Sequence, residues 1–99
     1  MEKLRTQAAR KYRLLTCYRF WMFTGHKEYE ESLILILTNE GGSISFAFTD
    51  LTTNQTTSFE NPSSGEYVIP LQKSGKMKLI ITANKAIGAY KIVKKTIKP

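Results

Sequence analysis

The 99-residue sequence contains one cysteine and one histidine. Because Cys17 stands alone, no disulfide can form within the chain, which excludes a small secreted fold held together by disulfides. One cysteine and one histidine also fall short of the four ligands that a structural zinc ion takes. His26 follows a glycine in a predicted turn, where we expect an exposed side chain without a catalytic role. We therefore predict a protein that is not an enzyme and holds neither a metal nor a cofactor.

Long apolar segments are missing as well. The best apolar run, residues 33–37, is far shorter than the roughly 20 residues that span a membrane. No apolar segment of secretory length follows the basic first fourteen residues. We expect no membrane span and no signal peptide, and the sequence indicates no compartment.

Motifs for phosphate binding and acid–base catalysis are absent or weak. Residues 73–76 contain lysine and glycine but lack the frame of a phosphate-binding loop and the helix that follows it. Glu28 and Glu30 would share one face of a strand, where neighbouring carboxylates usually form a solvated surface. These patterns give no support to a catalytic site.

The chain instead shows the pattern of an antiparallel β protein. Turn signals recur about every eight to twelve residues and separate about seven predicted strands. We predict these strands over residues 14–24, 28–38, 43–49, 55–59, 66–71, 77–83 and 89–97. The spacing favours a single β-sandwich, immunoglobulin-like or jelly-roll-like. The hairpins from Leu71 onward resemble, in fold alone, the closing strands of bacterial accessory β-sandwich modules.

The domain is expected to cover residues 14–99, after a basic segment at residues 1–13. Within that segment Leu4, Ala8 and Tyr12 recur every four residues, which predicts a short helix, and a frayed tail is the alternative. Leu35 lies in a strand that is apolar on both faces, and Phe46 lies in a strict alternation, so both are predicted core residues.

Charge is distributed in three blocks. Residues 1–25 have a net charge of +5, residues 26–70 of −6 and residues 71–99 of +8. If the first and last strands are neighbours, the two termini form one cationic face that would bind nucleic acid or another anionic surface. Alternatively, the segments of opposite sign pair with each other for solubility. The candidate anion-binding residues are Arg10, Lys11, Arg13, Arg19, Lys91, Lys94, Lys95 and Lys98.

An aromatic cluster lies in the first strand of the predicted domain. Tyr18, Phe20, Trp21 and Phe23 surround Arg19. These side chains are expected mainly in the core, because aromatic residues dominate core burial. The alternative is a platform on which bases or sugars stack.

The expected function is a non-catalytic binding or accessory module that interacts with another protein. The sequence supports this mainly by lacking catalytic groups and by offering strand edges for a partner. Nucleic-acid or anionic-surface binding through the basic termini is one alternative, and a structural subunit of a homo-oligomer is the other. The oligomeric state is left open.

Overall fold

The computed structural model describes residues 2–97, except for the side chains of Tyr12 and Arg13. Its regular structure consists of five strands: β1 (Glu2–Thr24), β2 (Glu30–Asp50), β3 (Gln55–Phe59), β4 (Gly65–Leu71) and β5 (Lys76–Ile97). The prediction of an all-β antiparallel chain is confirmed. Among these residues there is no helix, and so none that could cross a membrane.

The helix predicted within residues 1–13 is wrong. Residues 2–10 pair in antiparallel register with β5, from Glu2 opposite Ile97 to Arg10 opposite Tyr90. Helix propensity is a weak preference that tertiary context overrides. Here the edge of β5 offers a ladder of backbone hydrogen bonds, and β1 crosses the predicted domain boundary at residue 13 without interruption.

The five strands form one continuous antiparallel sheet. The strand order is β1-β5-β2-β3, and β4 pairs with the first part of β2. In β2, residues 31–37 pair with β4 and residues 46–50 pair with β3. β1, β2 and β5 each exceed 20 residues, whereas most strands have 3–10 residues.

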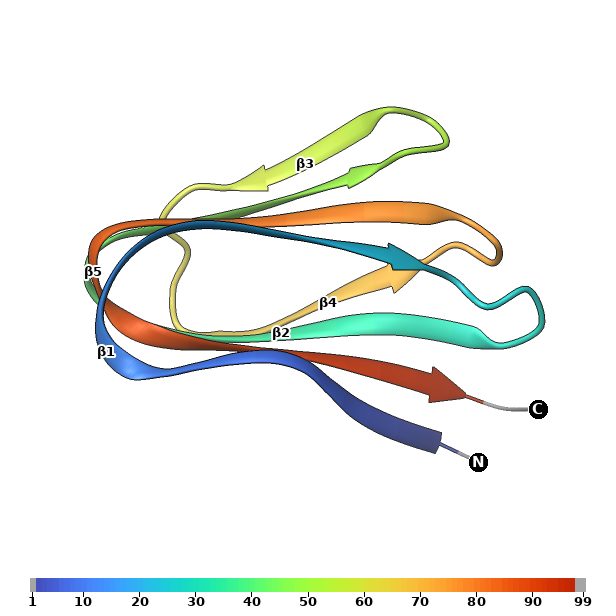
Figure 1. The fold of residues 1–99 in the computed structure, drawn as a ribbon, viewed down its shortest axis with the longest axis horizontal. Coiled ribbons are helices and arrows are strands. Elements are labelled where there is room, and N and C mark those ends of the chain that lie inside the picture. The colour runs from blue at the N-terminus through green and yellow to red at the C-terminus, as the bar shows by residue number, and fades with distance from the viewer. Residues whose placement is uncertain (1, 98–99) are drawn as a thin grey trace.

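The three long strands bend midway, so that the sheet folds over on itself (Figure 1). One half contains β3 and the other contains β4, and the two halves face each other. The predicted turns at residues 39–42 and 84–88 are bends within β2 and β5, where the pairing register shifts between Asn39 and Ser43. Each pair of predicted strands on either side of these bends is therefore one long strand.

Glycines allow β2 and β5 to approach closely at the bend. Gly42 has a φ of +70°, a conformation that glycine adopts without steric cost. A Cβ atom at Gly88 would collide with the backbone carbonyl oxygen of Thr38 on β2. The sequence marks these positions as turns because a sharp bend in a strand and a hairpin both need glycine.

The core lies between the two facing halves of the sheet. Leu35 is fully buried and Phe46 is 3% exposed, which confirms both as core residues. Along residues 33–37 the leucines are buried, whereas Ile34 and Ile36 are half-buried on the outer face. Cys17 is half-buried and packs against this core.

Candidate docking edge and basic strands

β1 is an edge strand along its whole length. Within residues 2–97 it pairs with β5 alone, and its other edge has no partner strand. At the opposite side of the sheet, β3 and β4 each pair with β2 alone. A free edge presents backbone N–H and C=O groups that can pair with an added strand.

Exposed apolar side chains concentrate on β1. Eight large apolar side chains are exposed among the described residues, and five of them belong to this strand: Leu4, Leu14, Tyr18, Phe20 and Met22. Their exposed fractions range from 55% to 66%. Such side chains next to a free strand edge form a surface suited to a partner.

The predicted aromatic cluster divides between the two faces of β1. Trp21 and Phe23 point toward the core, and the Trp21 ring meets the Tyr90 ring edge-on at 5.8 Å between centroids. Tyr18 and Phe20 point outward and are 61% and 55% exposed. The expectation of a core role therefore holds for half of the cluster.

The Phe20 ring has a cation beside it. The Nζ atom of Lys78, on the neighbouring strand β5, lies 4.7 Å from the centre of the ring. An ammonium group over an aromatic face is attracted by the ring quadrupole. An exposed aromatic ring and a lysine thus share one part of the outer face.

The candidate anion-binding residues occupy adjacent strands but do not form one face. Residues directly opposite in an antiparallel ladder share a face of the sheet. Lys91 lies opposite Ala9 and points outward, whereas Arg10 lies opposite the buried Tyr90 and shares its inner face. Arg19 lies opposite Ile81, in the half of the folded sheet that does not contain Lys91.

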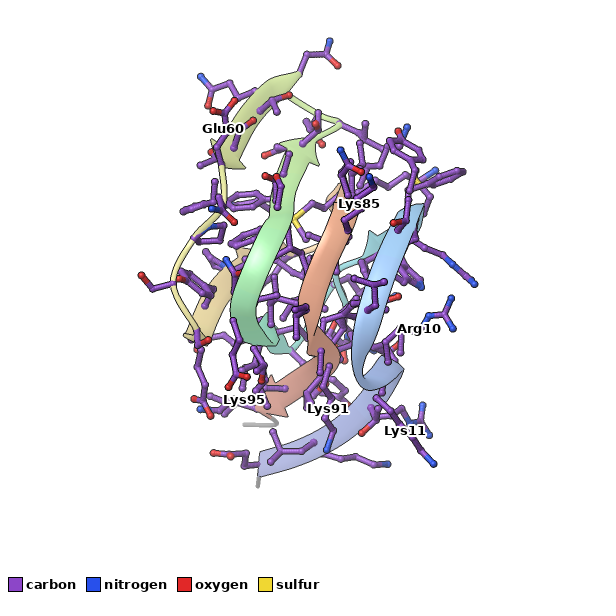
Figure 2. All side chains as sticks on the ribbon, turned by 90° about the vertical axis from the view of Figure 1, so that its left-hand side faces the viewer. Arg10, Lys11, Glu60, Lys85, Lys91 and Lys95 are labelled. Carbon is purple, nitrogen blue, oxygen red and sulfur yellow. The ribbon has the colours of Figure 1, made fainter. Side chains whose placement is uncertain are left out.

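The other candidates differ in their surroundings. Lys11 is exposed at the bend of β1, as Figure 2 shows. The Nζ atom of Lys95 lies 3.6 Å from Oε2 of Glu2, and that of Lys94 lies 3.2 Å from Oε2 of Glu31. The side chain of Arg13 and the whole of Lys98 lie outside the described residues.

Glu31 is the centre of a small polar cluster. Its Oε2 atom accepts a hydrogen bond from the Thr96 hydroxyl at 2.7 Å, and its Oε1 atom accepts one from the backbone N–H of His26 at 2.7 Å. Burial raises the pKa of this carboxyl, but these hydrogen bonds and the Lys94 ammonium outweigh burial, so its pKa is lowered. The positive charge of Lys94 is therefore paired with Glu31 inside this cluster.

Charge is polarised across the sheet. β1 and β5 together hold twelve lysines and arginines and one acid, whereas β2, β3 and β4 hold five acids and no lysine or arginine. Figure 2 shows Glu60, which follows β3, at the opposite side of the sheet from Arg10 and Lys11. The three charge blocks were visible in the sequence, but the strand order that sorts them into two sides was not.

Other kinds of site find no support in the described part of the chain. Within residues 2–97, no three His, Cys, Asp or Glu side chains gather in a way that would hold a metal ion. No known protein family matches the sequence, and no curated protein matches it either. The functional argument therefore rests on the free edge, the exposed apolar side chains and the charge distribution.

Proposed function

We propose that the chain is a non-catalytic binding module of the β-sandwich type, in which the folded-over sheet supplies both layers and β1 docks a protein partner. One observation carries this proposal. β1, whose outer edge is unpaired along its whole length, also holds five of the eight exposed large apolar side chains among residues 2–97. Backbone pairing would supply affinity, and the side chains would supply specificity.

The chemistry of β1 defines the partner segment. An added strand would satisfy the free backbone groups and cover Tyr18, Phe20 and Met22 on the outer face. Six cations and one acid on β1 favour an acidic segment, because like charges directly opposite destabilise strand pairs. An extended segment that alternates acidic and β-branched apolar residues meets both requirements.

Titration with synthetic peptides tests the proposal. The probe is a ten-residue peptide of alternating valine and glutamate, and the matched control replaces each glutamate with lysine. Trp21 is the only tryptophan and lies on β1, so its fluorescence reports binding. We expect the acidic peptide to bind and to protect β1 amides from hydrogen exchange. If neither peptide binds nor protects β1, the proposal is wrong.

A second candidate function is binding of single-stranded nucleic acid. The observation that favours it is the position of Tyr18, Phe20 and Lys78 together on the outer face of two basic strands. Nonspecific single-strand binding combines aromatic rings that stack on bases with cations that follow the phosphates. This candidate uses the outer face of the sheet, whereas protein docking also uses the β1 edge.

A further inference from the structure

We infer that the partner of β1 is a second copy of this chain, which binds through its β3–β4 edge, so that copies add head to tail into one continuous sheet. This inference rests on the proposed function, because it assigns the partner of the same edge. The argument uses strand direction, charge and the register of the sheet.

Strand direction permits this arrangement. β1 and β2 are both antiparallel to β5, so they run in the same direction, and β3 and β4 run in the opposite direction. When a second copy is placed beside the first in the same orientation, its β1 is antiparallel to β3 and β4 of the first. Antiparallel pairing therefore continues across the junction without any rearrangement of either copy.

Charge favours this pairing over a two-fold dimer. Pairing β1 with β1 would bring two strands of net charge +5 together. Pairing β1 with the β3–β4 edge brings that charge against Glu60 and Glu66, in a stretch from residue 28 to residue 72 that has no lysine or arginine. Opposite charges across strands stabilise the pair, and like charges destabilise it.

The register predicts a specific contact at the junction. Arg19, Ile81, Phe46 and Phe59 form one row across the sheet. In a stack without a shift along the strands, Arg19 of one copy lies opposite Phe59 of the next. Phe59 stacks on Phe46 with 4.7 Å between ring centroids, and Phe59 is only half-buried. An exposed arginine beside a half-exposed ring forms a cation–π contact.

The other half of the sheet gives a second contact. Ala9, Lys91, Ile36 and Glu66 form a row, so Glu66 lies opposite Ala9 of the next copy, two residues from Lys11. Pro70 ends the usable part of β4, because proline has no N–H group to donate.

Head-to-tail contacts leave one unpaired edge at each end of the assembly, unless the rotation between successive copies closes a ring. The number of copies in an assembly therefore increases with protein concentration. Each copy adds four strands to each half of the continuous sheet. The assembly therefore lengthens by about 19 Å per copy, at about 4.8 Å between neighbouring strands. The twist between neighbouring strands rotates successive copies and makes the assembly helical.

Sedimentation velocity of the full chain over a range of concentrations tests the inference. We expect the mean mass to rise continuously with concentration and to fall at high salt. Arg19→Glu is designed to block the β1 edge, and Glu60→Lys is designed to block the β3–β4 edge. Both variants should fold, because both residues are exposed. Each variant alone should associate at least tenfold more weakly. The matched control Lys91→Glu, in the middle of the sheet, should associate like the wild type.

Mixing the two blocked variants gives the decisive result. The intact β1 edge of Glu60→Lys can bind the intact β3–β4 edge of Arg19→Glu, so the mixture should associate more strongly than either variant alone. A chain that stays monomeric at every concentration overturns the inference, as does a discrete two-fold dimer or an assembly that nuclease dissolves. If self-association fails while the acidic peptide still binds β1, the proposed function stands and only the partner is wrong.

Discussion

Lys94 on β5 and Glu31 on β2 form an ion pair within a half-buried polar cluster. The Lys94 Nζ and Glu31 Oε2 atoms lie 3.2 Å apart, and the Glu31 side chain is only 5% exposed. Thr96 lies directly opposite Glu31 in the ladder and donates its hydroxyl to the same carboxylate oxygen. These contacts join the C-terminal part of β5 to the start of β2. This part of β5 also pairs with the edge strand β1.

The cluster makes stability depend on pH. Because the pKa of Glu31 is lowered in the folded chain, its ionised form stabilises the fold above the ordinary glutamate pKa of about 4.3. That contribution is lost as the pH falls through the lower folded pKa. We expect Glu31→Gln to be less stable than the wild type at pH 7, with a difference that shrinks below about pH 4. Urea unfolding at pH 7, 5 and 3 measures this, and a difference that does not change with pH would contradict it.

Leu35 tests the position of the core. Its side chain has no exposed surface, so Leu35→Ala should lower the free energy of unfolding by about 2–5 kcal/mol. Ile36→Ala is the matched control, because Ile36 is half-buried on the outer face of the same strand and should cost less. Urea unfolding compares the two variants. A loss below about 1 kcal/mol for Leu35→Ala would show that this strand is not central.

The bend in the sheet depends on glycine at residue 88. Gly88→Ala should lower stability by more than about 1 kcal/mol, because the added methyl group would collide with the backbone of Thr38. Gly41→Ala is the control, since its nearest contact would be the Ile87 Cδ1 atom at 3.5 Å, an ordinary van der Waals distance. Thermal unfolding of the two variants should separate them clearly. Equal effects would mean that the two strands do not cross closely at this bend.

Much of the strand pattern could be predicted because alternation and turn residues are local signals. All seven predicted strands lie within observed strands apart from residues 28 and 29. The turns predicted at residues 50–54 and 73–76 match observed turns at residues 51–54 and 73–74. Glycines at residues 42 and 88 gave the same signal for bends within strands, because Gly42 has a positive φ and Gly88 lies against the backbone of Thr38. Residues 2–13 were misread because a helix-compatible sequence pairs with a distant strand.

The candidate site was only partly visible in the sequence. The two termini do lie side by side, since residues 2–10 pair with residues 90–97. The predicted strands 14–24 and 89–97 are not neighbours, however, because residues 14–24 pair with residues 76–87, which places Arg19 opposite Ile81. Register over more than 20 residues depends on bulges, which shift the pairing between Thr6 and Ala8 and again between Arg10 and Arg13. Strand order is also a non-local property, so the polarisation of charge across the sheet could not be predicted from three charge blocks alone.

The second candidate function, binding of single-stranded nucleic acid, can be tested through its dependence on salt. If the outer face of β1 and β5 binds single strands, a labelled oligonucleotide should bind at low salt, with affinity falling steeply as salt rises. Lys78→Glu should weaken binding to every sequence alike and reduce the salt slope by about 1, for the one lost phosphate contact. Lys94 is a poor choice for this test, because its charge already pairs with Glu31.

The aromatic rings give an independent measurement of the same binding mode. Tyr18→Ala with Phe20→Ala should weaken binding by about 1–3 kcal/mol for each stacked base while leaving the salt slope unchanged, because stacking releases no counterions. Trp21→Phe is the control, since Trp21 packs against Tyr90 on the inner face. No binding at low salt excludes this function. A loss confined to one base sequence would contradict it as well, because lysine point charges and stacked rings do not read sequence.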